Sequence, residues 1–71
     1  MSTTQLILKL KTLDQKYTNV VKILKNLQLL KKAGKTNDEI MEVITSLKLP
    51  FSVHMFITGY FSDLITLKYD Y

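Results

Sequence analysis

The chain has 71 residues, a formal net charge of +4 and no cysteine, so residues 1–71 are expected to form a single helical domain without a disulfide or a thiolate metal site. A chain this short buries only about 60% of the surface that its unfolded form exposes, which leaves oligomerisation or very regular helix packing to stabilise it. No apolar run approaches the roughly 18 residues of a membrane span. The lack of cysteine fits a reducing compartment, so we expect a cytoplasmic protein.

Lysine supplies all ten basic residues of the chain. Residues 1–35 carry eight lysines and one acid, a net charge of +7, whereas residues 36–71 carry two lysines and five acids, a net charge of −3. A basic half joined to an acidic half predicts electrostatic association, within the molecule or with a partner. The absence of arginine disfavours direct reading of guanine edges. Lysine without arginine is also typical of AT-rich genomes, and we take a phage or plasmid origin as a hypothesis.

The first predicted element is a long helix over about residues 4–32, which would extend roughly 43 Å. Its apolar residues recur at alternating spacings of four and three, the pattern of the a and d positions of three heptads. We call this set the heptad row, and we predict that it forms the core of a homodimer: Leu6, Leu10, Leu13, Tyr17, Val20, Leu24 and Leu27.

Two capping signals compete at the start of this helix. One begins at Ser2 and places Gln5 three residues later, whereas the other begins at Thr12 and places Gln15 there. The second choice leaves residues 5–11 in an alternating pattern that is typical of a strand, and the C-terminal segment from residue 65 alternates in the same way. The alternative to one continuous helix is therefore a short β pairing of the two terminal segments.

Four lysines fall on the side of the predicted helix opposite Leu13, Val20 and Leu27. A charged side opposite an apolar side is typical of any solvated amphipathic helix. The functional alternative is a surface that contacts phosphates or an acidic partner. The residues in question are Lys11, Lys22, Lys25 and Lys32.

A helix end and a helix start follow each other in the middle of the chain. Gly34 comes after a lysine-rich stretch, as at the end of a helix. Thr36 and Glu39 then form a capping box. The next helix is predicted over about residues 37–48 and is ended by Pro50. Its apolar residues have helical spacing: Ile40, Val43, Ile44 and Leu47.

The third predicted helix begins at Ser52 and reaches about Leu64, with its own row of apolar residues. Other apolar side chains lie off this row, in excess of what three helices need, and methionine and tyrosine provide adaptable contact surfaces. We predict that the protein-binding residues are among Phe51, Met55, Tyr60, Tyr69 and Tyr71.

The chain lacks the constellation of groups that catalysis requires. His54 is its only histidine, and its two glycines form no phosphate-binding motif. Three acids cluster at the start of the second predicted helix, where capping and the helix dipole explain them: Asp38, Glu39 and Glu42. We therefore expect a protein that is not an enzyme and that uses no cofactor, metal or small-molecule substrate.

Two segments resemble DNA-binding units. Residues 32–40 and 47–53 resemble the first helix entry and the turn of a helix-turn-helix unit, and residues 34–40 also resemble the interhelical turn of a ribbon-helix-helix dimer, whose strand would be residues 5–11. These resemblances imply a dimeric DNA-binding transcriptional regulator. Residues 52–64, however, contain no lysine, arginine, asparagine or glutamine to read base edges. The first prediction is therefore a regulatory module that binds a protein, such as a repressor, a polymerase or a replication protein, and DNA binding is second.

Overall fold

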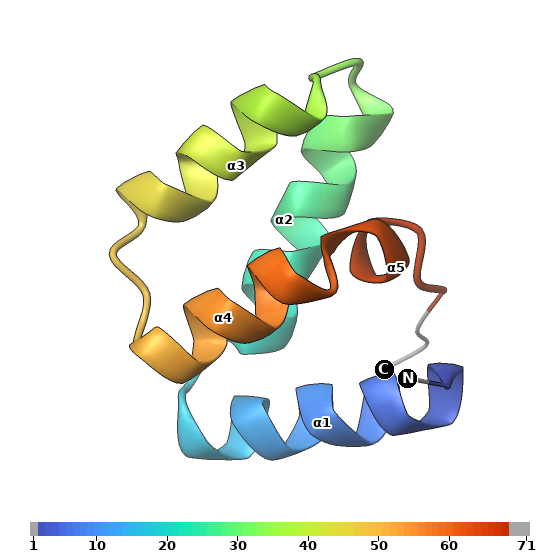
Figure 1. Ribbon diagram of the computed structural model, residues 1–71, viewed down its shortest axis with the longest axis vertical. Helices are drawn as coiled ribbons and strands as arrows, with labels where there is room; N and C mark the ends of the chain where they lie inside the picture. Colours follow the sequence, from blue (N-terminus) through green and yellow to red (C-terminus); the bar gives the residue numbers. More distant parts are fainter. Residues whose placement is uncertain (1, 69–71) are drawn as a thin grey trace.

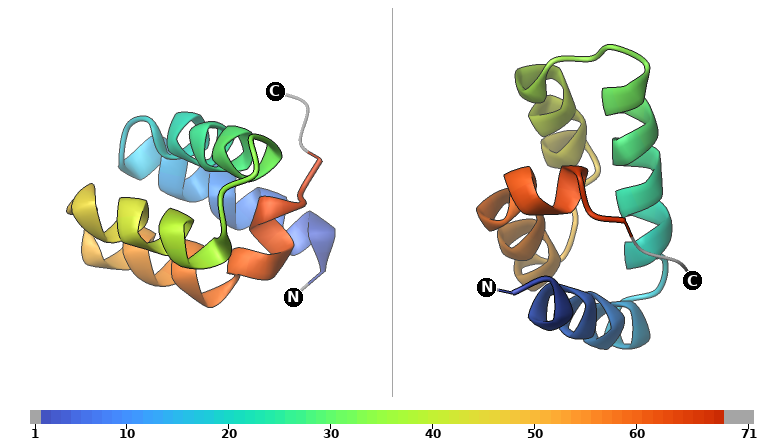
Figure 2. Two further views of the ribbon diagram at one scale, coloured as in Figure 1. Left: turned by 90° about the horizontal axis from the view of Figure 1, so that it is seen from above. Right: turned by 90° about the vertical axis from the view of Figure 1, so that its right-hand side faces the viewer.

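The computed structural model describes residues 2–68, and all the regular structure in that range is helical. The helices are α1 (Thr3–Lys16), α2 (Val20–Lys32), α3 (Asn37–Ser46), α4 (Phe51–Gly59) and α5 (Phe61–Ile65). α1 lies across one end of α2, α4 runs back along α3, and α5 turns towards α2 (Figures 1 and 2). The predicted helical class is confirmed. The predicted count of three helices is wrong for the described residues, because the first and third predicted helices are each divided in two.

The helix predicted over residues 4–32 is divided at residues 17–19, which we call the corner. Tyr17 has an extended backbone (φ −123°, ψ 105°). Asn19 has a left-handed backbone (φ 75°), which asparagine adopts more readily than most residues that carry a Cβ. The carboxylate of Asp14 accepts a hydrogen bond from the Val21 backbone N–H at 3.0 Å and so caps α2 from the preceding helix.

The core draws on all five helices. It consists of Leu6, Leu10, Leu13, Val20, Leu24, Leu27, Ile40, Ile44, Val53, Phe56, Ile57, Phe61, Leu64 and Leu67. Six of the seven residues of the heptad row are in this set, and Tyr17 is half-buried against it. Because the chain turns at the corner, the row encloses a core within one chain instead of extending along one helix. A homodimer through the heptad row remains a prediction.

The helical reading of residues 5–11 is correct, and the strand alternative is wrong. The Ser2 hydroxyl accepts a hydrogen bond from the Gln5 backbone N–H at 3.2 Å, and the Gln5 side chain accepts one from the Ser2 N–H at 3.0 Å, so the first of the two capping signals is used. Thr12 instead donates its hydroxyl to the Leu8 carbonyl within the helix. Residues 65–68 form no strand, and the remainder of the predicted C-terminal strand, residues 69–71, lies outside the described residues.

The turn between α2 and α3 follows its sequence signals. Gly34 has a left-handed backbone (φ 99°). Its N–H donates to the Lys31 carbonyl, and the Lys35 N–H donates to the Leu30 carbonyl, both at 3.1 Å, which is the hydrogen-bond pattern of a Schellman motif. The capping box of Thr36 is present as well. These local signals set the end of α2 and the start of α3.

The helix predicted from Ser52 to Leu64 is divided at Tyr60, whose backbone (φ −117°, ψ 28°) leaves the helical region. The division lets α5 reach α2, where the side-chain amide of Gln28 donates to the Leu64 carbonyl at 2.9 Å and to the Leu67 carbonyl at 2.8 Å. These two bonds tie the end of α5 to the middle of α2. Over residues 2–68, no helix combines the length and the apolar character that crossing a bilayer requires.

Candidate functional site

α4 is apolar on two opposite sides. Val53, Phe56 and Ile57 are buried in the core. Phe51 and Met55 lie one helical turn apart on the other side, and their side chains are 78% and 52% exposed. We call these two side chains the Phe51/Met55 face. The informative feature of a small domain is an exposed cluster of large apolar side chains, and such a cluster usually marks an interface.

The start of α4 is set by Pro50, which precedes the helix and accepts a hydrogen bond from the His54 N–H at 2.9 Å. Phe51 is therefore the first helical residue, and its side chain is not part of the buried core. Leu47, at the end of α3, is 46% exposed. It adds a third apolar side chain just before the connection into α4. No charged residue occurs between Pro50 and Ser62, so burying this region against a partner desolvates no charge.

The structure brings together only two of the five predicted protein-binding residues. Tyr60 is half-buried, and its ring lies 5.6 Å from the Phe56 ring at an interplanar angle of 52°. It therefore packs with the core and away from the Phe51/Met55 face. Tyr69 and Tyr71 lie outside the described residues. Sequence reasoning missed Leu47, because its helical spacing assigned it to the buried side of α3; its place close before Pro50 was the available signal.

Three of the four predicted phosphate-contacting lysines lie on the outer side of α2, opposite its buried residues, and all are exposed: Lys22, Lys25 and Lys32. We call them the α2 lysine face. Lys11 is exposed on α1, which the corner turns away from the axis of α2 (Figure 1). The expected single face of four lysines on one straight helix is therefore wrong. Leu29, 62% exposed, lies among the three lysines of α2.

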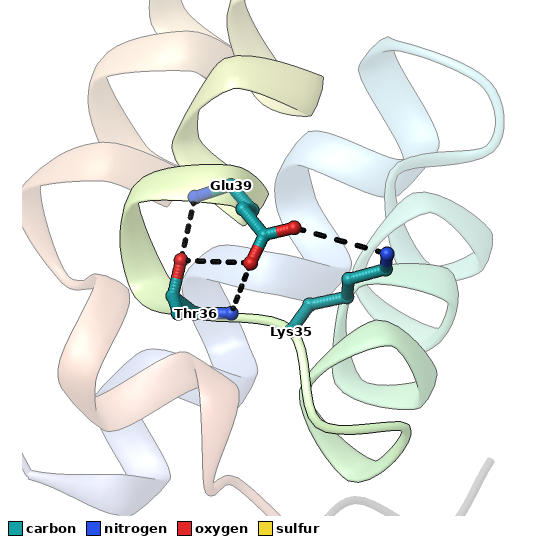
Figure 3. Close-up of polar contacts among 3 residues, drawn as sticks. All are labelled: Lys35, Thr36 and Glu39. Atoms are coloured by element: carbon teal, nitrogen blue, oxygen red, sulfur yellow. Dashed lines mark hydrogen bonds and ion pairs between the residues drawn. The ribbon is translucent and has the colours of Figure 1, made fainter.

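The acidic start of α3 is occupied by structural hydrogen bonds (Figure 3). Glu39 accepts one from the Thr36 backbone N–H at 3.2 Å and another from the Thr36 hydroxyl at 3.1 Å, and Lys35 lies 3.7 Å from its other oxygen. The backbone bond, then the hydroxyl bond, hold the pKa of Glu39 below its ordinary value, and the positive charge of Lys35 adds a smaller effect. These contacts explain Glu39 as a capping residue.

Within residues 2–68, no three His, Cys, Asp or Glu side chains gather in a way that could hold a metal ion. The chain matches no protein-family model, no curated protein and no solved structure. A functional proposal for this chain therefore rests on its own residues.

Proposed function

We propose that this chain is a small non-enzymatic regulatory module that binds another protein, and that the Phe51/Met55 face is its docking surface. The observation that carries this proposal is the 78% exposure of Phe51 on a helix whose opposite side already fills the core. Phe51 contributes little to folding, yet it presents one of the side chains that interfaces favour. The partner classes expected from the sequence, a repressor, a polymerase or a replication protein, are the first to test.

The energetics favour an apolar partner surface. Fully burying a phenylalanine or methionine side chain is worth about 1.5–3 kcal/mol each. Because α4 already fixes the backbone of Phe51 and Met55, burial costs only the rotamer freedom of their side chains, about 0.5–1.5 kcal/mol each. Anchors spaced by one helical turn fit the mode in which a helix lays one side into a hydrophobic groove. We therefore expect the partner to offer a groove that accepts the first turns of α4.

The α2 lysine face supports a second candidate function, direct binding to DNA as a dimeric regulator. Three lysines at helical spacing can neutralise phosphates, and each contact adds about 0.9 to the log–log salt slope. The exposed Leu29 among them disfavours this candidate, because an apolar side chain offers phosphates neither charge nor a hydrogen bond. A binding shift on duplex DNA across a salt series tests this candidate: replacing Lys22, Lys25 and Lys32 with Gln should flatten the slope by about 2.7 if all three contact phosphates.

Site-specific photo-crosslinking tests the docking surface. A benzophenone amino acid replaces Phe51 in one variant and the exposed α1 residue Gln15 in the control, both expressed in the native host. The proposal expects a discrete crosslinked protein from position 51 that mass spectrometry identifies and that is absent from position 15. Equal products from both positions would contradict the docking surface. No product from position 51, with nucleic acid that co-purifies with the chain, would favour the DNA-binding candidate.

A further inference from the structure

The heptad row keeps its spacing across the corner. Leu13, Tyr17 and Val20 are separated by four and three residues, as they are within each helix. In the turned chain this register buries Leu13 and Val20 and packs Tyr17 against the core. The same apolar row would line one side of a straight helix formed by α1 and α2 together.

The corner is held by few interactions of its own. The backbone N–H groups of Thr18 and Asn19 donate no hydrogen bond within the described chain. Asn19 is left-handed and makes no side-chain cap for α2. The bond from the Val21 N–H to Asp14 would be exchanged, in a straight helix, for a bond to the Tyr17 carbonyl. Straightening the corner therefore gives the Thr18 and Asn19 N–H groups helical acceptors, and the Val21 N–H exchanges one acceptor for another.

α1 packs chiefly on α2 and buries Leu6, Leu10 and Leu13 in the core. If the corner straightens, α1 leaves its place and this part of the core is open. A second copy of the same chain offers the matching segment, since its own α1 has left in the same way. Every buried contact of α1 can then be re-formed between two chains. For this reason domain swapping forms a dimer at a low cost in free energy.

We propose that a second copy of this chain binds here by exchanging α1: the corner opens, α1 and α2 join into one helix, and each copy covers the core of the other. The continuous heptad row places both halves of the apolar surface on one side of the joined helix, so two cores sit side by side along it. The inference does not depend on the Phe51/Met55 face. A mutation that abolishes partner binding at this face therefore leaves dimer formation measurable, and a mutation that abolishes dimer formation leaves partner binding measurable.

Two substitutions at Asn19 test the hinge in opposite directions. Asn19→Ala disfavours the left-handed backbone and favours helix, whereas Asn19→Gly accepts the left-handed backbone and disfavours helix. Because both copies carry the change, the dimer dissociation constant of N19A should be on the order of 100-fold lower than that of N19G. Sedimentation equilibrium over a concentration series measures both. Equal constants, or a monomeric N19A at all concentrations, would overturn the proposal.

A complementation experiment tests the exchange itself, with the hinge unchanged. Leu10→Asp damages α1, and Ile57→Asp damages the part of the core that lies outside α1; both residues are fully buried. Each variant alone is expected to be unfolded. Refolded together, an exchanged pair contains one undamaged unit, made from α1 of the I57D chain and the remaining helices of the L10D chain. The proposal expects recovery of helical circular dichroism at the mass of two chains, and no recovery contradicts it.

Discussion

Lys48 is one of two non-glycine residues within residues 2–68 that have a left-handed backbone, with φ at 51°. The Cβ of an L-residue is crowded there, whereas glycine has no such penalty. Lys48→Gly is therefore expected to raise the free energy of unfolding by about 0.5–1 kcal/mol, the left-handed penalty less the entropy cost of glycine, measured by urea denaturation. Lys48→Ala removes the same charge but keeps Cβ, and it should give no such gain. If both variants are stabilised equally, charge and not backbone conformation is the cause.

Glu39 gives the fold a defined response to acid. Its folded-state pKa is lowered, chiefly by the bond from the Thr36 backbone N–H, so its contribution to stability is present above the unfolded-state pKa of about 4.3 and is lost as the pH falls through the lower folded-state value. Glu39→Gln should lower the melting temperature at neutral pH. In strong acid the melting temperatures of the variant and the parent should become equal. Glu42→Gln, an equal change of charge on the same helix, is the control for the loss of one negative charge. A Glu39→Gln difference that persists unchanged in acid would contradict the linkage.

At the scale of elements, Gln28 is the polar link between α2 and α5. Gln28→Ala leaves the Leu64 and Leu67 carbonyls without this donor, and each lost bond costs about 0.5–1.5 kcal/mol. The expected loss in free energy of unfolding is therefore about 1–3 kcal/mol. Asn26→Ala, at an exposed position of α2, is the matched control and should change it little. Equal losses from both variants would contradict the role of the link to α5, because alanine favours the helix at both positions and only Gln28 makes the link.

Local signals predicted the element ends that depend on a few neighbouring residues. The capping boxes at Ser2 and Thr36 and the left-handed Gly34 all act over three or four residues, and all are found where the sequence places them. The corner was not predictable in this way. An apolar row spaced four and three is the same whether the helix is straight or bent, and Asn19 is only a weak signal of a left-handed residue. Tertiary packing decides between the straight and the bent helix, and the local pattern carries no information about tertiary packing.

The candidate site was predicted in part for the same reason. Phe51 and Met55 lie off the buried row of α4, so helical periodicity alone separates them from the core. Tyr60 could not be placed by periodicity, because the helix ends at this residue and its ring turns to Phe56. Leu47 could not be placed either: its backbone is still helical, but together with Val43 it lies on the exposed edge of the apolar row of α3.

At the scale of the whole molecule, charge is divided along the chain. Residues 1–35, which include α1 and α2, are basic, and residues 36–71, which include α3, α4 and α5, are acidic. The uncharged α4, which presents the Phe51/Met55 face, belongs to the acidic half. Charges around an apolar docking surface mainly set orientation and association rate. We expect added salt to change the association rate of the partner more than its dissociation rate, measured by surface plasmon resonance.

The most direct test of the docking surface is calorimetric titration of three forms of the chain into the purified partner that the crosslinking experiment identifies. The forms are the parent, Phe51→Ala/Met55→Ala, and the triple Gln variant of the α2 lysine face. The double variant should weaken binding by on the order of 100-fold, because central aromatic anchors carry much of the affinity of an interface, and the triple variant should stay close to the parent. Undiminished binding by the double variant, with loss in the triple variant, would contradict the account and place the site on α2.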